Sequence, residues 1–130
     1  WEGYIPVVTP LATGKNGEVF NVNADIAACK IAEALHVRKL VFLSDVPGVM
    51  RDQNDPSSVI STIKTTDVPE LIASKVISGG MLPKIESCLS ALNSGVNKVH
   101  MIDGRAEHSL LLELFTDKGV GTEIVKPDSI

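Results

Sequence analysis

Segments with the pattern of buried strands alternate with segments that have the pattern of helices along most of this chain of 130 residues. Four apolar runs predict strands, at 4–9, 39–43, 98–102 and 120–125. A short run at 18–22 follows a Gly-Lys-Asn-Gly turn signal and predicts a hairpin with the first strand. Periodic or capped stretches predict four helices, at 24–35, 67–75, 83–95 and 108–115. This order predicts an α/β fold, a mainly parallel sheet flanked by helices, with ligands at the carboxyl ends of the strands.

The length and composition limit the class of protein. No linker or repeat interrupts the sequence, so residues 1–130 are expected to form a single domain. A net charge of −4 argues against binding nucleic acid through a broad basic surface. No apolar run reaches the roughly 18 residues of a membrane span, so no membrane partner is expected. Cys29 and Cys88 lie in predicted helices without zinc-type spacing, which predicts reduced core residues of an intracellular protein and no metal site.

The run from Ile77 to Lys84 places a lysine where a cation is disfavoured. Pro83 suits the first position of a helix, so Lys84 is expected in the first turn, where free N–H groups and the helix dipole oppose a cation by up to roughly 1 kcal/mol. A bound anion would reverse the sign, and Gly79 and Gly80 would allow its close approach. The run therefore predicts a phosphate cradle. The alternative is an exposed lysine on a glycine-containing loop.

Two amides and a carboxylate cluster between a predicted strand and a predicted helix. Asn21 and Asn23 can donate to a substrate carboxylate, and Asp25 can anchor an ammonium group. Simple helix capping explains Asn23 and Asp25 equally well, because asparagine is a favoured cap and an acid suits the first turn. Capping leaves Asn21 unexplained.

A second polar cluster follows the buried strand at 39–43. Ser44 and Asp45 stand at its carboxyl end, before the turn at Pro47-Gly48, which is the place where such sheets bind ligands. The alternative is an ordinary strand-to-loop turn. Neither a P-loop nor a dinucleotide fingerprint is present.

The histidines show no catalytic pattern. His36, His100 and His108 lie on different predicted elements without metal or triad spacing, and His36 and His100 are expected at the surface or at a strand edge. Ser44 and Ser78 have no histidine nearby in sequence, so a serine nucleophile has little support.

Four motifs in order, Asn21–Asp25, Leu43–Val49, Ile77–Lys84 and His108–Thr122, resemble the carboxyl-terminal half of the acetylglutamate kinases, a branch of the amino acid kinase family. The similarity runs from about Tyr4 to Val125. It implies the nucleotide-binding lobe of that fold. Other family members share the sheet and the lysine but not the 21–25 motif in this form.

The resemblance implies ATP-dependent phosphorylation of the side-chain carboxylate of N-acetyl-L-glutamate in arginine biosynthesis. Asp25 and Lys84 would be catalytic and would meet over one nucleotide-shaped hollow at the edge of the sheet. Asn21 and Asn23 would lie on the substrate, and Mg²⁺ on the phosphates of ATP. Thirteen residues would bind the nucleotide: Ser44, Asp45, Val46, Pro47, Gly48, Val49, Met50, Val76, Ile77, Ser78, Gly79, Gly80 and Met81. Phosphoryl transfer depends mainly on positioning and charge neutralisation, which agrees with a lysine at a helix start.

The last motif resembles the signature of the arginine-inhibited branch of the family. The resemblance implies that His108, Glu113, Gly119 and Gly121 bind arginine as a feedback inhibitor, whereas an amphipathic helix that leads into a strand is the structural alternative. It also implies a homo-oligomer, a PII-type regulatory protein as a partner, and a cytoplasmic location, or a plastid or mitochondrial one in a eukaryote.

The chain begins at Trp1-Glu2-Gly3 without a methionine, and the amino-terminal half of the family, with its glycine-rich loop and first catalytic lysine, is absent. We therefore expect weak ATP binding and negligible turnover from this chain alone. Two other functions stay open: another amino acid kinase, of the aspartate or glutamate 5-kinase type, and a non-catalytic arginine-sensing module.

Overall fold

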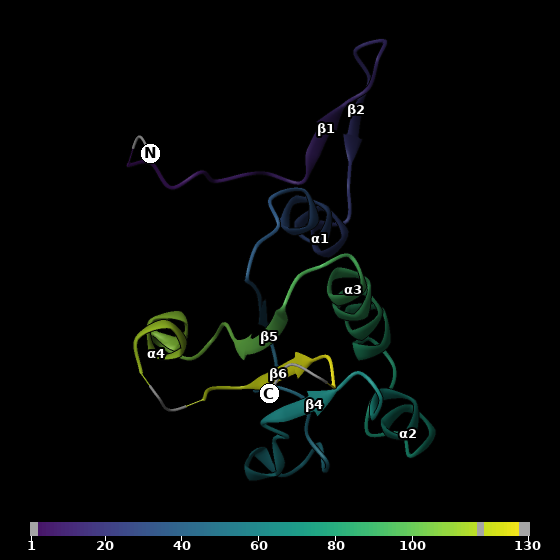
Figure 1. The fold of residues 1–130 in the computed structure, drawn as a ribbon, viewed down its shortest axis with the longest axis vertical. Helices are drawn as coiled ribbons and strands as arrows, with labels where there is room; N and C mark the ends of the chain where they lie inside the picture. Colours follow the sequence, from purple (N-terminus) through teal and green to yellow (C-terminus); the bar gives the residue numbers. More distant parts are fainter. Residues whose placement is uncertain (1–2, 117–118, 128–130) are drawn as a thin grey trace.

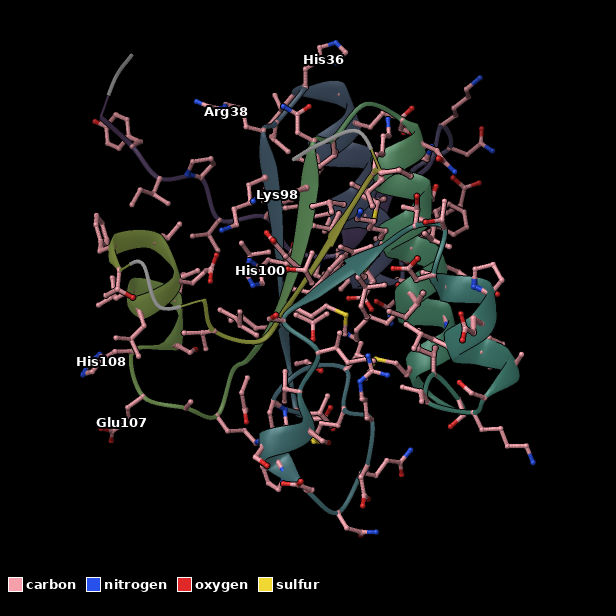
Figure 2. The ribbon with its side chains drawn as sticks, turned by 60° about the horizontal axis from the view of Figure 1, so that its bottom comes forward. His36, Arg38, Lys98, His100, Glu107 and His108 are labelled. Atoms are coloured by element: carbon pink, nitrogen blue, oxygen red, sulfur yellow. The ribbon has the colours of Figure 1, made fainter. Side chains whose placement is uncertain are left out.

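The computed structural model describes residues 3–116 and 119–127. The expectation drawn from Trp1 and Glu2, and the Asp117-Lys118 part of the last motif, lie outside the described residues. A mixed sheet forms the centre (Figures 1 and 2). Helices α1 (Ala24–Ala34), α2 (Val68–Ala73) and α3 (Met81–Asn93) lie on one side of it and α4 (Ser109–Phe115) lies on the other. Among the described residues, no helix is both long and apolar enough to span a bilayer.

The sheet has four strands in the order β3 (Lys39–Ser44), β5 (Lys98–Asp103), β6 (Thr122–Val125) and β4 (Thr62–Lys64). The β3–β5 and β4–β6 pairs are parallel and β5–β6 is antiparallel, so the prediction of a mainly parallel sheet flanked by helices is confirmed. The strand β4 is missing from the sequence prediction, because three residues with one buried side chain, Ile63, carry no periodic pattern.

The last strand runs against β5, and it starts two residues later than predicted. The connecting helix α4 (Ser109–Phe115) has seven residues and is about 10 Å long, whereas the six residues of β5 span about 20 Å. A helix this short does not carry the chain back to the start of β5, so β6 returns antiparallel.

The prediction of a buried strand at 4–9 is wrong. This segment is extended but unpaired, and Ile5 and Val7 are about nine-tenths exposed. An apolar run forms a strand only where another strand pairs with it, and pairing here begins at Leu11. The predicted hairpin is confirmed in shorter form by β1 (Leu11–Thr13) and β2 (Val19–Asn21), which project away from the sheet (Figure 1).

Helices α1 (Ala24–Ala34) and α3 (Met81–Asn93) pack against each other and against the sheet, and α2 (Val68–Ala73) and a 3₁₀ turn at Pro56–Ser58 complete the described helices. Asn23 caps α1, with its Oδ1 accepting from the Ile26 N–H at 3.1 Å. The helix α3 begins at Met81, two residues before the predicted start at Pro83.

The core lies between α1, α3 and the sheet. Along α3 the buried side chains are Ile85, Cys88, Ala91 and Leu92. Cys29 and Cys88 are both buried free thiols, as predicted. Burial raises the pKa of Cys29, and it raises the pKa of Cys88 to about 12.

Candidate functional site

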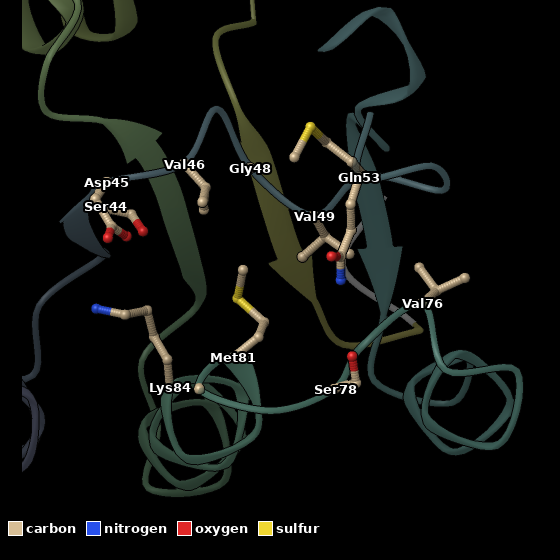
Figure 3. Close-up of a pocket in the computed structure, with 12 residues that line it drawn as sticks. Ser44, Asp45, Val46, Gly48, Val49, Gln53, Val76, Ser78, Met81 and Lys84 are labelled. Carbon is tan, nitrogen blue, oxygen red and sulfur yellow. The ribbon is translucent and has the colours of Figure 1, made fainter. Parts of the chain in front are cut away.

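A hollow of about 370 Å³ opens at the carboxyl end of β3, between the loop that follows this strand and the start of α3 (Figure 3). Its size is within the range of small-molecule sites. The lining residues come from two segments that are remote in sequence, 44–53 and 76–84: Ser44, Asp45, Val46, Gly48, Val49, Met50, Gln53, Val76, Ser78, Gly80, Met81 and Lys84. The hollow therefore lies where an α/β sheet is expected to bind a ligand.

Most of the thirteen residues predicted to bind a nucleotide line this hollow, and three do not. Pro47 and Gly79 are adjacent to lining residues, and Ile77 is a core residue with 1% exposure. Ile77 turns inward because its neighbours Val76 and Ser78 face the hollow. Gln53 also lines the hollow and was not predicted, since the polar loop at 51–58 has no periodic pattern that would single out one residue.

Lys84 and Asp25 form an ion pair with Nζ and Oδ2 3.2 Å apart, as the sequence predicted for these two charges. The side chains are 22% and 34% exposed, so both keep contact with solvent. The Lys84 Nζ also lies 5.5 Å from the centre of the Phe42 ring, which is buried in β3. Two partners on different elements thus hold the ammonium at the edge of the hollow.

The start of α3 differs in detail from the predicted cradle. Pro83 is the third residue of the helix and has no N–H, while the N–H groups of Met81 and Leu82 donate to Ser78 and Gly79 carbonyls at 3.2 Å. Lys84 is consequently the fourth helical residue. The N–H groups of Gly79 and Gly80 have no partner among the described residues, so they are the donors left for an anion.

Gly80 is a glycine that the fold does not require. Its φ is −64°, and a Cβ added there would meet no atom within 4 Å. By contrast, a Cβ on Gly121 would come 2.0 Å from the Met101 carbonyl oxygen, so packing alone explains Gly121. The open space at Gly80 fits a ligand that approaches the backbone closely.

A second hollow, of about 420 Å³, lies between α1 and α3 and shares Gly80 and Lys84 with the first. Asn23 and Asp25 line it. Asn21 is exposed at the end of β2 and lines neither hollow. The structure thus brings Asn23 and Asp25, but not Asn21, close to Lys84.

Asp103 ends β5 beside Ser44, but its carboxylate is engaged elsewhere. The Nε and Nη2 atoms of Arg105 donate to it at 2.9 Å each, and these bonds hold the pKa of Asp103 at about 2. Within the described residues, no group of three or more His, Cys, Asp or Glu side chains could hold a metal ion.

A buried charge cluster occupies the opposite side of the sheet, around Glu113 of α4. Its carboxylate pairs with Lys39, and its Oε1 lies 2.7 Å from Nδ1 of His100, without hydrogen-bond alignment. A hollow of about 190 Å³ includes this cluster together with Gly119 and Gly121. Three of the four residues predicted to bind arginine therefore meet there.

His108 is not part of this cluster, and the expectation that His100 lies at the surface is wrong. His108 is exposed at the start of α4 with a φ of 57°, and Figure 2 shows it at the outer corner, away from His100. His100 is 5% exposed because α4 packs against β5 and Glu113 of that helix lies against the imidazole. Burial lowers the pKa of His100, and the nearby Glu113 carboxylate opposes this effect.

Comparison with known proteins places these features in a family. A family model described as amino acid kinase family matches residues 1–103. The acetylglutamate kinases of Heliobacterium modesticaldum and Pelotomaculum thermopropionicum are 56% and 54% identical to the chain, over 124 and 125 residues. These matches cover 95% and 96% of this chain but 42% of each relative, so the chain spans less than half the length of these curated relatives.

A similar solved structure is that of N-acetylglutamate synthase from Neisseria gonorrhoeae, complexed with coenzyme A and L-arginine. It superposes with a TM-score of 0.77 at 33% sequence identity, over 90% of this chain and 26% of that chain. The family model and the superposition indicate the same kind of fold, and the main hollow lies where such a fold is expected to bind a ligand. Because the family model spans most of the sequence, the chain belongs to the amino acid kinase family.

Proposed function

We propose that this chain is the ATP-binding half of a kinase that phosphorylates the side-chain carboxylate of N-acetyl-L-glutamate. The observation that carries the proposal is the position of Lys84, whose ammonium is paired with Asp25 and lies where two hollows meet. The first hollow would hold the nucleotide and the second would admit the acceptor. The similarity to acetylglutamate kinases supports this substrate.

In this reaction a carboxylate oxygen of the substrate attacks the γ-phosphorus, the bond to the β–γ bridging oxygen breaks, and ADP leaves with its electron pair. The negative charge spreads over the equatorial oxygens of the transferring group, and the Lys84 ammonium would neutralise part of it. Asp25 would hold the lysine in position. The free N–H groups of Gly79 and Gly80 would donate hydrogen bonds to a phosphate oxygen.

Mg²⁺ is compatible with this site if the nucleotide phosphates supply most of its ligands. Asp45 supplies a carboxylate and Ser44 a hydroxyl to the lining of the hollow, which are suitable oxygen ligands but too few for a protein-only site. The ion would supply charge neutralisation at the phosphates.

Asn23 is the better placed of the two proposed substrate amides. Its Oδ1 caps α1, which leaves its NH₂ group free to donate to the α-carboxylate of the substrate. We keep Asn21 as a proposed substrate residue, although it is exposed at the tip of β2. A homo-oligomer, a PII-type partner and a cytoplasmic location belong to the same proposal.

The test is a chimera in which this chain replaces the matching segment of the Heliobacterium kinase. We expect acetylglutamate-dependent ADP release from the chimera, negligible release from the chain alone, and a loss of orders of magnitude in rate with Lys84→Ala, because lost transition-state stabilisation is typically worth several kcal/mol. Lys15→Ala, on the exposed hairpin turn, is the control. A chimera that prefers aspartate or glutamate would favour another amino acid kinase. An unchanged rate with Lys84→Ala would contradict the catalytic role and favour a sensor.

A second proposed function is arginine binding at the Glu113 cluster. A buried carboxylate and the loop carbonyls near Gly119 and Gly121 suit a guanidinium and an ammonium group, and the related synthase was crystallised with L-arginine. His100, rather than His108, would be the histidine of this site. Arginine must displace Lys39 or His100 from Glu113. Calorimetric titration with arginine should give binding that Glu113→Ala abolishes, and retained binding in that variant would refute the site.

A further inference from the structure

Gln53 is a polar residue at the main hollow to which the proposed function gives no task. It lies in the loop of residues 51–58, after the segment that carries Ser44 to Met50. We propose that the Gln53 carboxamide recognises the base of the bound nucleotide and selects adenine over guanine. The inference rests on the proposed function, because it requires a nucleotide in this hollow.

The polar loop around Gln53 is held by its own side chains. Asp52 Oδ1 accepts from the Asn54 N–H at 2.9 Å, and Asp55 Oδ1 accepts from the N–H and the hydroxyl of Ser57 at 2.9 and 2.6 Å. Ser58 Oγ accepts from the Asp52 N–H at 3.0 Å. These bonds restrain the backbone on both sides of Gln53, which reduces the entropy that the loop would lose on binding. The Gln53 side chain itself is exposed.

The carboxamide of Gln53 has no hydrogen-bond partner within 3–116 and 119–127. It offers one acceptor and two donor hydrogens at the rim of the hollow. A loop in which several neighbouring polar groups bond to one another, while one amide stays free and lines a cavity, is suited to bind an external polar group.

The two ends of the hollow differ in character. Figure 3 shows Lys84 beside Asp45 at one end, and Gln53 beside Val49 at the other end with its amide turned toward the space between them. The cation and the free N–H groups at the start of α3 select the phosphates for the first end. The base then falls at the second end, where Val49 and Val76 offer apolar contact to its faces (Figure 3).

Adenine and guanine present different edges to an amide at this position. On adenine, the exocyclic amine is a donor and N7 is an acceptor, which a glutamine amide satisfies with its oxygen and its NH₂ group together. On guanine, O6 and N7 are both acceptors, so the amide oxygen has no donor to face. A bidentate contact of this kind discriminates by about tenfold or more.

The experiment measures dissociation constants of the 130-residue chain for ATP, GTP and inorganic triphosphate, by NMR shift titration to millimolar ligand. We expect ATP to bind about tenfold more tightly than GTP. Gln53→Leu should weaken ATP about tenfold and leave GTP and triphosphate within about twofold. Gln53→Arg should invert the ATP-to-GTP preference, because arginine donates twice to O6 and N7 of guanine. Asn54→Leu is the control, since that side chain is outside the lining.

The outcomes separate the two proposals. Equal ATP affinity in the wild type and in Gln53→Leu, with triphosphate binding that depends on Lys84, would overturn the inference and leave the nucleotide site standing. Equal wild-type affinity for ATP and GTP would overturn it as well. Failure of both ATP and triphosphate to bind, or binding that Lys84→Ala does not change, would overturn the proposed function together with the inference.

Discussion

Two of the lysine–carboxylate pairs among the described residues, Lys84–Asp25 and Lys39–Glu113, differ in burial and in surroundings. Lys84 and Asp25 meet between two helices, with 22% and 34% of their side chains exposed. Lys39 and Glu113 meet between a strand and a helix, where Glu113 is 5% exposed and a histidine lies against it. The first pair borders hollows of about 370 and 420 Å³, and the second borders one of about 190 Å³.

Similar charge pairs have different consequences in different dielectric surroundings. A partly exposed pair adds little to folding but leaves a cation free to interact with a ligand. A buried carboxylate with two basic partners couples to stability, because removal of one member leaves the others poorly compensated. We therefore expect variants at Asp25 and Lys84 to affect function more than stability, and variants at Glu113 and His100 to affect stability first.

The largest effect on stability is expected from Glu113→Gln. The substitution leaves Lys39 without its partner, although Lys39 at 29% exposure can turn partly to water, so we expect a loss of about 1–3 kcal/mol in the free energy of unfolding. Urea denaturation measures it, with Glu107→Gln on the exposed segment as the matched control. Equal stability of the two variants would remove the distinction between the pairs.

At the other pair, Gly80→Ala should separate function from folding. The added methyl meets no protein atom within 4 Å, and alanine lowers the entropy of the unfolded chain, so the free energy of unfolding should rise by about 0.5 kcal/mol. The same methyl would stand where phosphate approaches the backbone, and ATP affinity should fall about tenfold or more. A titration with unchanged affinity would show that no ligand comes close to Gly80.

The next largest effect is expected in the pH dependence of stability, through His100 beside the buried Lys39–Glu113 pair. The folded-state pKa of His100 lies below the usual value of about 6.5, so the unfolded chain binds more protons below that pH. Stability should therefore fall as the pH drops below about 6.5, by at most about 1.4 kcal/mol per pH unit for this one group.

Lys39, Glu113 and Glu123 also face His100, so the slope belongs to the cluster. Unfolding curves between pH 5 and 8 should lose part of the slope in His100→Gln and keep it in His36→Gln, which alters an exposed side chain. The same slope in all three proteins would assign the pH dependence to other groups.

The smallest effect is expected from Asp25→Asn on stability. A pair that is about one-quarter to one-third exposed contributes between a few tenths of a kcal/mol and about 1 kcal/mol to the free energy of unfolding. Roughly 0.5 M salt should remove most of this contribution. Denaturation at low and high salt measures it. A loss as large as that of Glu113→Gln, and insensitive to salt, would mean that the two pairs do not differ in kind.

Local patterns predicted most of the helices and the two longest strands of the sheet. The caps and periodicity of α1 and α3 and the apolar runs of β3 and β5 lie close to their predicted bounds. The strand β4 and the direction of β6 were not predicted, because pairing partners and the length of a connection are tertiary properties. The prediction of a buried strand at 4–9 was wrong for the same reason.

The chemistry available at the site can be identified from the amino-acid sequence: a lysine near a helix start, two glycines before it and a carboxylate in the first turn of another helix. Motif order pointed to the family, and Asp25 and Lys84 were predicted to meet, as they do. These features are local or carried by the resemblance, so short stretches of sequence suffice to state them.

Only the tertiary structure decided that Gln53 borders the hollow and that His100, not His108, faces Glu113. Each of these relations joins elements far apart in the chain, across a loop or across neighbouring strands. Burial and proximity are set by how layers pack, and no periodicity within one element encodes which remote side chain will lie opposite it.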